Sequence, residues 1–332
     1  MEVIGGSVVV RGPNDEGPHP ASSDPWWQES VTLIWWDLDQ YIGGFHRIGH
    51  EPNRPEGPQV HLANSLFTRD HVYRRSVYMP MQSGDRLANG FGSDNGQNRF
   101  EFVDGKSIWT LKDSEISAQL ISTDHHIPVD IWPKGGELGK DIAPEHMEVA
   151  STVTGTVTIA GKTYHVNGAA FRDHGWGIRH WEKIMVYRWV VGVFDANLTV
   201  FAMTFLSPDG TLSRFGLVKK GDKLIAAKQV DIVTYIEADG FTHRGGRVRL
   251  LLATDEVMEF ECEALQKGTV NSHHGNTWLD TFCKMTCGDK IGVCDFEIAN
   301  RAFQGTTLPV CLERAVMTNG LHSAPQNRIP ST

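Results

Sequence analysis

The chain has 332 residues, a formal net charge of −9, and 40% hydrophobic against 21% charged residues. This composition is that of a globular protein with a normal core, and the length suits two domains. The acidic balance and the lack of a Lys/Arg cluster argue against a nucleic-acid partner, because phosphate binding needs a basic surface. No apolar run approaches the ~20 residues of a membrane span, and the N-terminus lacks the pattern of a secretory signal.

The five cysteines all lie in the last quarter of the chain. Their spacing is not that of a zinc knuckle, so we predict free thiols in a reducing compartment and a cytoplasmic location. They are Cys262, Cys283, Cys287, Cys294 and Cys311.

Residues 1–24 are rich in Gly, Pro, Asn and Ser, which predicts a flexible N-terminal tail. From Glu29 onward, short alternating runs recur roughly every 8–12 residues with Gly, Asp or Asn between them, a pattern typical of a β-sandwich or barrel. Asp104-Gly105 and Pro208–Gly210 have the composition of tight hairpin turns. Strands are predicted at 31–37, 43–49, 59–63, 70–78, 98–103, 107–111, 116–121, 151–159, 163–166, 187–194, 199–205, 215–218 and 247–252.

Few stretches have a helical period. The best helical candidate is Pro144–Val149, and the preceding segment, residues 128–144, is predicted to be a long loop. The glycine-rich segment 90–96 is predicted to be a turn. We therefore expect an all-β protein of two antiparallel β-barrel or sandwich domains, residues 25–180 and 181–332, after the tail of residues 1–24.

The segment Phe171–Glu182 concentrates polar and aromatic side chains. If it is extended, alternation places His174 and Trp176 on one face and Asp173 on the other. An imidazole beside an indole is a candidate acid–base cluster, with Arg179 to orient a substrate or pair a carboxylate. The same residues would equally suit a buried structural plug, so both interpretations stay open.

Other candidates for a site are weaker. His46, His50 and Glu51 lack the spacing of a zinc protease and are predicted to lie in a loop. Adjacent residues of a strand point apart, so neither His125-His126 nor His273-His274 is expected to share an ion. No phosphate-binding or dinucleotide motif is present, and we predict neither a cofactor nor a metal. Trp36, Tyr73, Trp181 and Trp189 are candidates for substrate binding, with the core as the alternative for Trp36.

The sequence Arg172-Asp-His-Gly-Trp-Gly177, preceded by Gly155–Gly161 and Val166-Asn-Gly168, resembles the signature of the double-calycin group. This group contains carotenoid 1,2-hydratase-like, kievitone hydratase-like and AttH-like proteins. Gly44–Gly49 with Pro52-Asn53 is similar to a matching N-terminal hairpin, and the resemblance spans roughly residues 30–310. It implies two lipocalin-like β-domains packed together around an apolar ligand cavity.

The resemblance also implies site residues. The His-x-Trp pair of the hydratases matches His174 and Trp176. Their downstream carboxylate and tyrosine, about 25 residues further on, are replaced here by Phe201 and Met203, so Asp173 or Asp195 would have to supply the acid.

Three functions fit these observations. The first is an enzyme that adds or removes water, or isomerises, at a C=C or C–OH of a terpenoid, steroid or aromatic molecule. Asp173 would be its acid, His174 a proton shuttle, Trp176 and Trp181 cation-stabilising faces, and Arg179 an orienting group. The second is a pericyclase of a polyketide-type substrate, and the third is a carrier of a lipophilic ligand. The expected partner is a hydrophobic small molecule, and a homodimer is compatible with the sequence.

Overall fold

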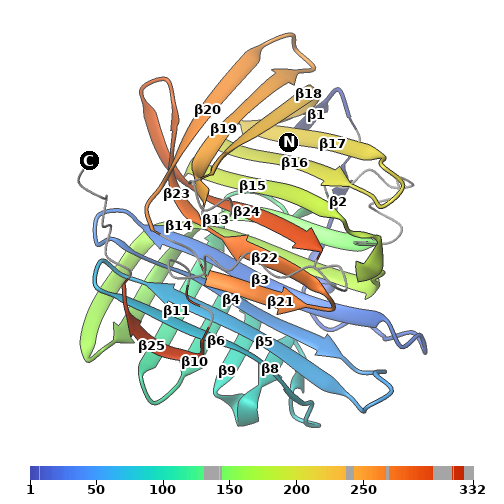
Figure 1. Cartoon of the computed structure of the whole chain (residues 1–332), viewed down its shortest axis with the longest axis vertical. Helices are drawn as coiled ribbons and strands as arrows, with labels where there is room; N and C mark the ends of the chain where they lie inside the picture. The colour runs from blue at the N-terminus through green and yellow to red at the C-terminus, as the bar shows by residue number, and fades with distance from the viewer. Residues whose placement is uncertain are drawn as a thin grey trace.

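The computed structural model describes residues 1–6, 8–130, 142, 144–236, 243–266, 269–301, 316 and 318–324. Over these residues the chain is almost entirely β, with two large sheets and three single-turn 3-10 helices (Figure 1). The all-β prediction is confirmed. No helix in this part of the chain is long and apolar enough to cross a membrane.

The first sheet is open and curled, in the order β25-β6-β5-β4-β3-β14-β13-β11-β10-β9-β8-β7, with β12 paired to β13 and β2 paired to β12. Its strands are β2 (Val9–Val10), β3 (Trp27–Asp37), β4 (Ile42–Glu51), β5 (Gln59–Phe67), β6 (His71–Pro80), β7 (Arg86–Leu87), β8 (Gly90–Ser93), β9 (Asn98–Val103), β10 (Lys106–Lys112), β11 (Ile116–Asp124), β12 (Val129–Asp130), β13 (Glu145–Ile159), β14 (Lys162–Ile178) and β25 (Gly320–Ser323). The 3-10 helices are η1 (Pro13–Asp15), η2 (Asp94–Gly96) and η3 (Trp181–Lys183).

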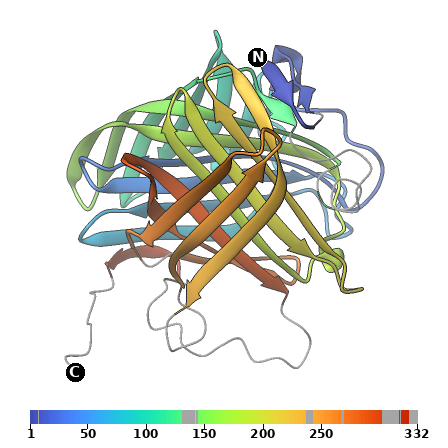
Figure 2. The ribbon, with the colours of Figure 1, turned by 90° about the horizontal axis from the view of Figure 1, so that it is seen from above.

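The second sheet closes into a barrel. Within the described ranges, eight strands form the ring β15-β16-β17-β18-β19-β20-β23-β24, and β24 pairs back onto β15. Figure 2 shows the yellow and orange barrel strands in front of the blue and green strands of the first sheet. The strands are β1 (Glu2–Ile4), β15 (Val186–Asp195), β16 (Leu198–Leu206), β17 (Leu212–Lys220), β18 (Lys223–Ile236), β19 (His243–Leu252), β20 (Val257–Ala264), β21 (Thr269–His273), β22 (Asn276–Asp280), β23 (Phe282–Cys287) and β24 (Lys290–Arg301).

An apolar layer joins the two sheets. Phe45 and Phe171 from the first sheet belong to the same buried cluster as Trp189, Phe201 and Phe282 from the second. Each sheet also has its own core, because alternation in a strand sends every second side chain to the opposite face. The fold is thus two lipocalin-like domains, each with its own core, packed through a third apolar layer.

Each end of the chain pairs with the domain that is formed by the other part of the sequence. β1 pairs with β18 of the barrel, and β25 pairs with β6 of the first sheet. Of the segment 1–24, expected to be a flexible tail, Glu2–Ile4 pair with the barrel and residues 8–24 contact the first sheet, where Glu16 is only 3% exposed. The predicted boundary at 180/181 lies in the connection between β14 and β15.

Several local predictions were wrong. Pro144–Val149 is not a helix, because β13 begins at Glu145 and pairs with β14 along its length. Residues 146–151 are all buried, so the strand lacks the alternation that would have marked it. The segment 90–96 is strand β8 followed by η2, and β4 extends the predicted strand 43–49 as far as Glu51, so His50 and Glu51 lie in a strand rather than in a loop. Most of the predicted loop at 128–144 lies outside the described residues.

Candidate active site

A cavity of about 130 Å³ opens between the two sheets. It receives side chains from β3, β4, β13 and β14 of the first domain and from β15, β16, β21, β22 and β24 of the second. Its apolar wall consists of Phe45, Ile142, Trp181, Ile184, Trp189, Met203, Phe205 and Trp278. Its polar groups are Ser30, Thr32, Arg47, His146, Asp173, Arg179, Tyr187, His273 and Glu297.

Asp173 supplies an ionised carboxylate to this cavity. Strand β14 lies between β3 and β13, and the register places Asp173 beside Thr32 and Glu148. Asp173 Oδ2 is 2.5 Å from His146 Nε2. Burial acts to raise the pKa of Asp173, but the contact with His146 and the charge of Arg179 outweigh it, and the pKa lies below its ordinary value. Asp173 is therefore set up to accept a proton rather than to donate one.

Arg179 brings free hydrogen-bond donors to the cavity. Burial lowers the pKa of its guanidinium to about 10, so the group stays charged at neutral pH. Neither Nε nor Nη2 has a hydrogen-bond partner among the described residues, although both are buried. Buried donors without partners are rare in proteins, and at the wall of a cavity they favour an oxygen-bearing ligand. A side chain at Gly175 would place its Cβ 2.1 Å from Arg179 Nη2, which explains the glycine at this position.

Glu297 supplies a second carboxyl group, whose pKa is raised rather than lowered. Burial raises its pKa well above the ordinary value, and the charge of Asp280 adds to the effect. The Tyr187 hydroxyl donates a hydrogen bond to Glu297 Oε1. Asp280, Asp295 and Glu297 each offer an oxygen, and these oxygens all lie within 4.8 Å of one another. Like charges this close cannot all ionise when buried, so Glu297 is predicted to be protonated at neutral pH.

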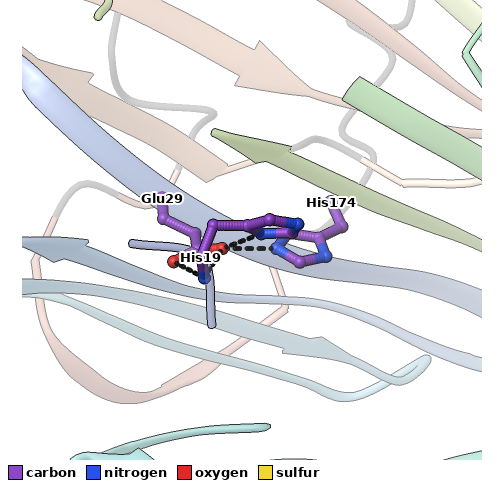
Figure 3. A group of neighbouring side chains, drawn as sticks. All are labelled: His19, Glu29 and His174. Carbon is purple, nitrogen blue, oxygen red and sulfur yellow. Dashed lines mark hydrogen bonds and ion pairs between the residues drawn. The ribbon is translucent and has the colours of Figure 1, made fainter. Parts of the chain in front are cut away.

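His174 does not line the cavity, and its side chain lies instead beside Glu29 and His19 (Figure 3). Its Nε2 is 3.1 Å from Glu29 Oε1, and His19 Nδ1 is 2.7 Å from the same oxygen. The His174 and Trp176 rings are neighbours, with centroids 5.0 Å apart, and the Trp176 ring also stacks on His19 at 3.8 Å. These contacts attach the N-terminal segment to the first sheet.

The Glu29 cluster gives a pH-dependent contribution to stability. Burial acts to raise the pKa of Glu29, but hydrogen bonds from His174 and His19 lower it from 4.5 to about 2. Because folding lowers this pKa, the stabilisation is fully present above pH 4.5 and is lost as the pH falls towards 2. We expect the unfolding free energy of the Glu29→Gln variant to vary less with pH across this window than that of the wild type. Chemical denaturation at several pH values checks this, with the exposed Glu259→Gln as control; equal pH dependence of both variants would contradict it.

The other predicted residues divide between cavity and core. Trp181 and Trp189 line the cavity. Trp36 lies in the apolar layer between the sheets, stacked on Phe282 with ring centroids 5.4 Å apart. Tyr73 is in the core of the first domain, and its hydroxyl donates to Asp113 at 2.7 Å.

Sequence reasoning missed His146, Tyr187 and Glu297. His146 falls in the segment predicted to be helical, and Glu297 lies over 100 residues beyond Phe171–Glu182. Only strand pairing between β15 and β24 brings Tyr187 and Glu297 together. A carboxyl group in the strongly apolar run of β24 was the one available signal, since charged residues are seldom fully buried without a role.

Four groups of side chains in the described part of the chain have ligand atoms close enough to hold a metal ion. Glu51, His273 and His274 form one group, and Glu51 Oε1 in it has no hydrogen-bond partner among the described residues. The others are His19 with Glu29 and His174, His146 with Glu148 and Asp173, and Asp280 with Asp295 and Glu297.

The chain has two lipocalin-like domains with a cavity between them, the fold that the resemblance seen in the sequence implied. The chain belongs to the family described as domain of unknown function DUF7064, whose model matches residues 12–302. A search of curated protein sequences gave no match.

Solved structures share this fold at low sequence identity. An AttH-like protein of Nitrosomonas europaea has a TM-score of 0.67 at 14% identity, covering 90% of this chain and 99% of that one. Kievitone hydratase from Nectria haematococca has a TM-score of 0.60 at 9% identity, covering 91% and 96%. CghA, in a structure with Sch210972, has a TM-score of 0.60 at 12% identity, covering 90% and 99%.

Proposed function

We propose that the protein is an enzyme that adds or removes water, or isomerises, at a C=C or C–OH of a hydrophobic small molecule, and that its own side chains carry the acid–base chemistry. The observation that carries the proposal is the pair of carboxyl groups at one apolar cavity, Asp173 with a lowered pKa and Glu297 with a raised one. Two carboxyl groups whose environments separate their pKa values are suited to act as base and acid.

In the proposed reaction Glu297 is the general acid. It protonates either an alkene carbon, as water adds, or a departing hydroxyl, which leaves as water. The Tyr187 hydroxyl then stabilises the resulting Glu297 carboxylate. Asp173 takes a proton from the attacking water in the first direction, or from the carbon next to the cation in the second. His146 is a positioning residue, because its bond to Asp173 fixes the carboxylate.

Arg179 and the tryptophans define the substrate class. The unpartnered donors of Arg179 fit an oxygen substituent of the substrate, such as a hydroxyl, carbonyl or carboxylate. Trp181 and Trp189 offer ring faces to a carbocation, an interaction of about 2 kcal/mol when desolvated. The cavity, at about 130 Å³, approaches the size of an apolar cavity known to bind benzene, roughly 150 Å³, so it fits one ring or prenyl unit.

A pericyclase acting on a polyketide-type substrate is the second candidate. The apolar wall and the Arg179 donors support it, because shape and one hydrogen bond are enough for such a reaction. It would leave Asp173 and Glu297 without a role.

Incubation in D2O with terpenoid, steroid and aromatic alkenes and alcohols, followed by mass spectrometry, tests the proposal. We expect a product that differs from the substrate by one water, or is isomeric with it, and exchange of solvent deuterium into a C–H position. An isomeric product without carbon-bound deuterium would favour the pericyclase. Tight binding without any product would overturn the enzyme proposal and favour a carrier.

A further inference from the structure

We propose that Glu51, His273 and His274 form a binding site for a zinc-like divalent cation that clamps the two domains together beside the cavity. The site goes beyond the proposed function, because neither Asp173 nor Glu297 belongs to it. Its role is structural and does not enter the acid–base chemistry.

The three residues come from both domains. Glu51 ends β4 of the first sheet, whereas His273 ends β21 of the second, and His274 follows it in the turn to β22. In Figure 1 the orange hairpin β21–β22 lies beside the blue strands β3 and β4. A cation held here would therefore cross-link the hairpin to the first sheet.

The distances suit a small tetrahedral cation. Glu51 Oε2 is 2.9 Å from His274 Nε2, and Glu51 Oε1 is 3.7 Å from His273 Nε2. With metal–ligand distances near 2.0–2.1 Å, two ligand atoms of a tetrahedral zinc site lie about 3.3 Å apart, between the two observed values. One carboxylate with two imidazoles is a ligand set that zinc favours.

The backbone at His274 is what brings both imidazoles to one side. Adjacent residues of a regular strand point in opposite directions, which is why the sequence argued against a shared ion. His274 has φ of +47°, in the left-handed region, and the two imidazole centroids lie 4.2 Å apart. His274 and Gly275, with φ of +47° and +81°, form the two-residue turn between β21 and β22, and this turn is what takes His274 out of the strand alternation.

Neighbouring side chains orient the imidazole of His273. The Tyr78 hydroxyl is bonded to His273 Nδ1, which orients the ring with Nε2 towards Glu51, as outer-sphere partners of metal-bound histidines do. Gln28 Oε1, 3.3 Å from His273 Nε2, is positioned as a fourth ligand.

The two oxygens of the Glu51 carboxylate differ in their contacts. Arg54 Nε lies 3.4 Å from Oε2, and its guanidinium stacks on the Trp26 ring at 4.5 Å. Oε1 is buried and has no hydrogen-bond partner in the described part of the chain. Oε1, on the side of His273, is therefore open to a cation, whereas Oε2 lies near both Arg54 and His274.

Zinc binding to the tag-free, chelator-treated full-length protein tests the proposal. Calorimetric titration is expected to give one zinc ion per chain, and zinc is expected to raise the melting temperature of the wild type. His274→Ala should weaken zinc binding at least about 100-fold and abolish the zinc-induced rise in melting temperature, which is measured for each variant against its own metal-free form. His274 is suited to this test because it does not line the cavity.

Two histidine variants serve as controls. His165→Ala removes an exposed histidine of β14, and His19→Ala removes a histidine from the cluster around Glu29. Both should bind zinc as the wild type does. The proposal is overturned if the wild type binds no zinc, if His274→Ala binds it unchanged, or if His19→Ala alone loses it.

Discussion

Glu297→Gln is expected to lower turnover on an identified substrate by about 10²–10⁴-fold, the usual contribution of a general acid. Glutamine has nearly the same shape and remains neutral, as the protonated Glu297 is predicted to be, but it has no acidic proton to give. Substrate affinity should therefore change little, and the loss should appear in kcat rather than in KM. Steady-state kinetics with direct measurement of binding separates the two quantities.

Asp295→Asn provides the matched control for this variant. Asp295 belongs to the same buried carboxyl cluster, and burial raises its pKa as well, but it does not line the cavity. Its replacement should leave most of the activity. Full activity of Glu297→Gln, or equal losses in both variants, would exclude Glu297 as the acid.

Arg172→Met is expected to lower the free energy of unfolding by about 3–5 kcal/mol, the cost of breaking a buried ion pair from one side. Arg172 is 1% exposed and bonds Glu16 through Nη1 at 2.5 Å and Nη2 at 2.9 Å. Nη2 also bonds Asp124 at 2.7 Å. Without the guanidinium, two carboxylates lose their main partner, and the N-terminal segment loses an attachment. Urea denaturation measures the free energy, and limited proteolysis reports release of the segment.

Arg249→Met is the control for the loss of a charge alone. Arg249 is 40% exposed and its contacts with Asp231 and Glu259 are 3.9 and 3.4 Å long. Exposed pairs contribute about 0–1 kcal/mol, so this variant should be nearly as stable as the wild type. A similarly small effect for Arg172→Met would mean that Arg172 does not anchor the segment.

Strands with alternating polarity, and buried strands rich in β-branched and aromatic residues such as β3, were predictable from the sequence, whereas the start of β13 was not. The run from Val31 to Asp37 and the Asp104-Gly105 hairpin were placed correctly within β3 and between β9 and β10. Asp104 and Gly105 have φ of +50° and +74°, as their turn type requires. The start of β13 was mistaken for a helix because neither of its faces is exposed.

The sequence located the candidate site better than it assigned roles within it. Asp173 and Arg179 were singled out, and both line the cavity. Alternation separated Asp173 from His174, and the structure places them on opposite faces of β14. Tyr187 and Glu297 depend on pairing between distant strands and on closure of the barrel, which no local pattern records. Their roles, like those of Asp173 and Arg179, remain proposals.

The protonation state of Glu297 at neutral pH tests the central claim most directly, and it needs no substrate. Infrared spectra of the wild type and of Glu297→Gln at pH 7 would be compared in the region of the protonated-carboxyl C=O stretch. We predict a band in the wild type, insensitive to pH around neutrality, that decreases in the variant. A wild-type spectrum without this band, or a band unchanged by the substitution, would show that Glu297 is ionised and would contradict the proposed acid–base pair.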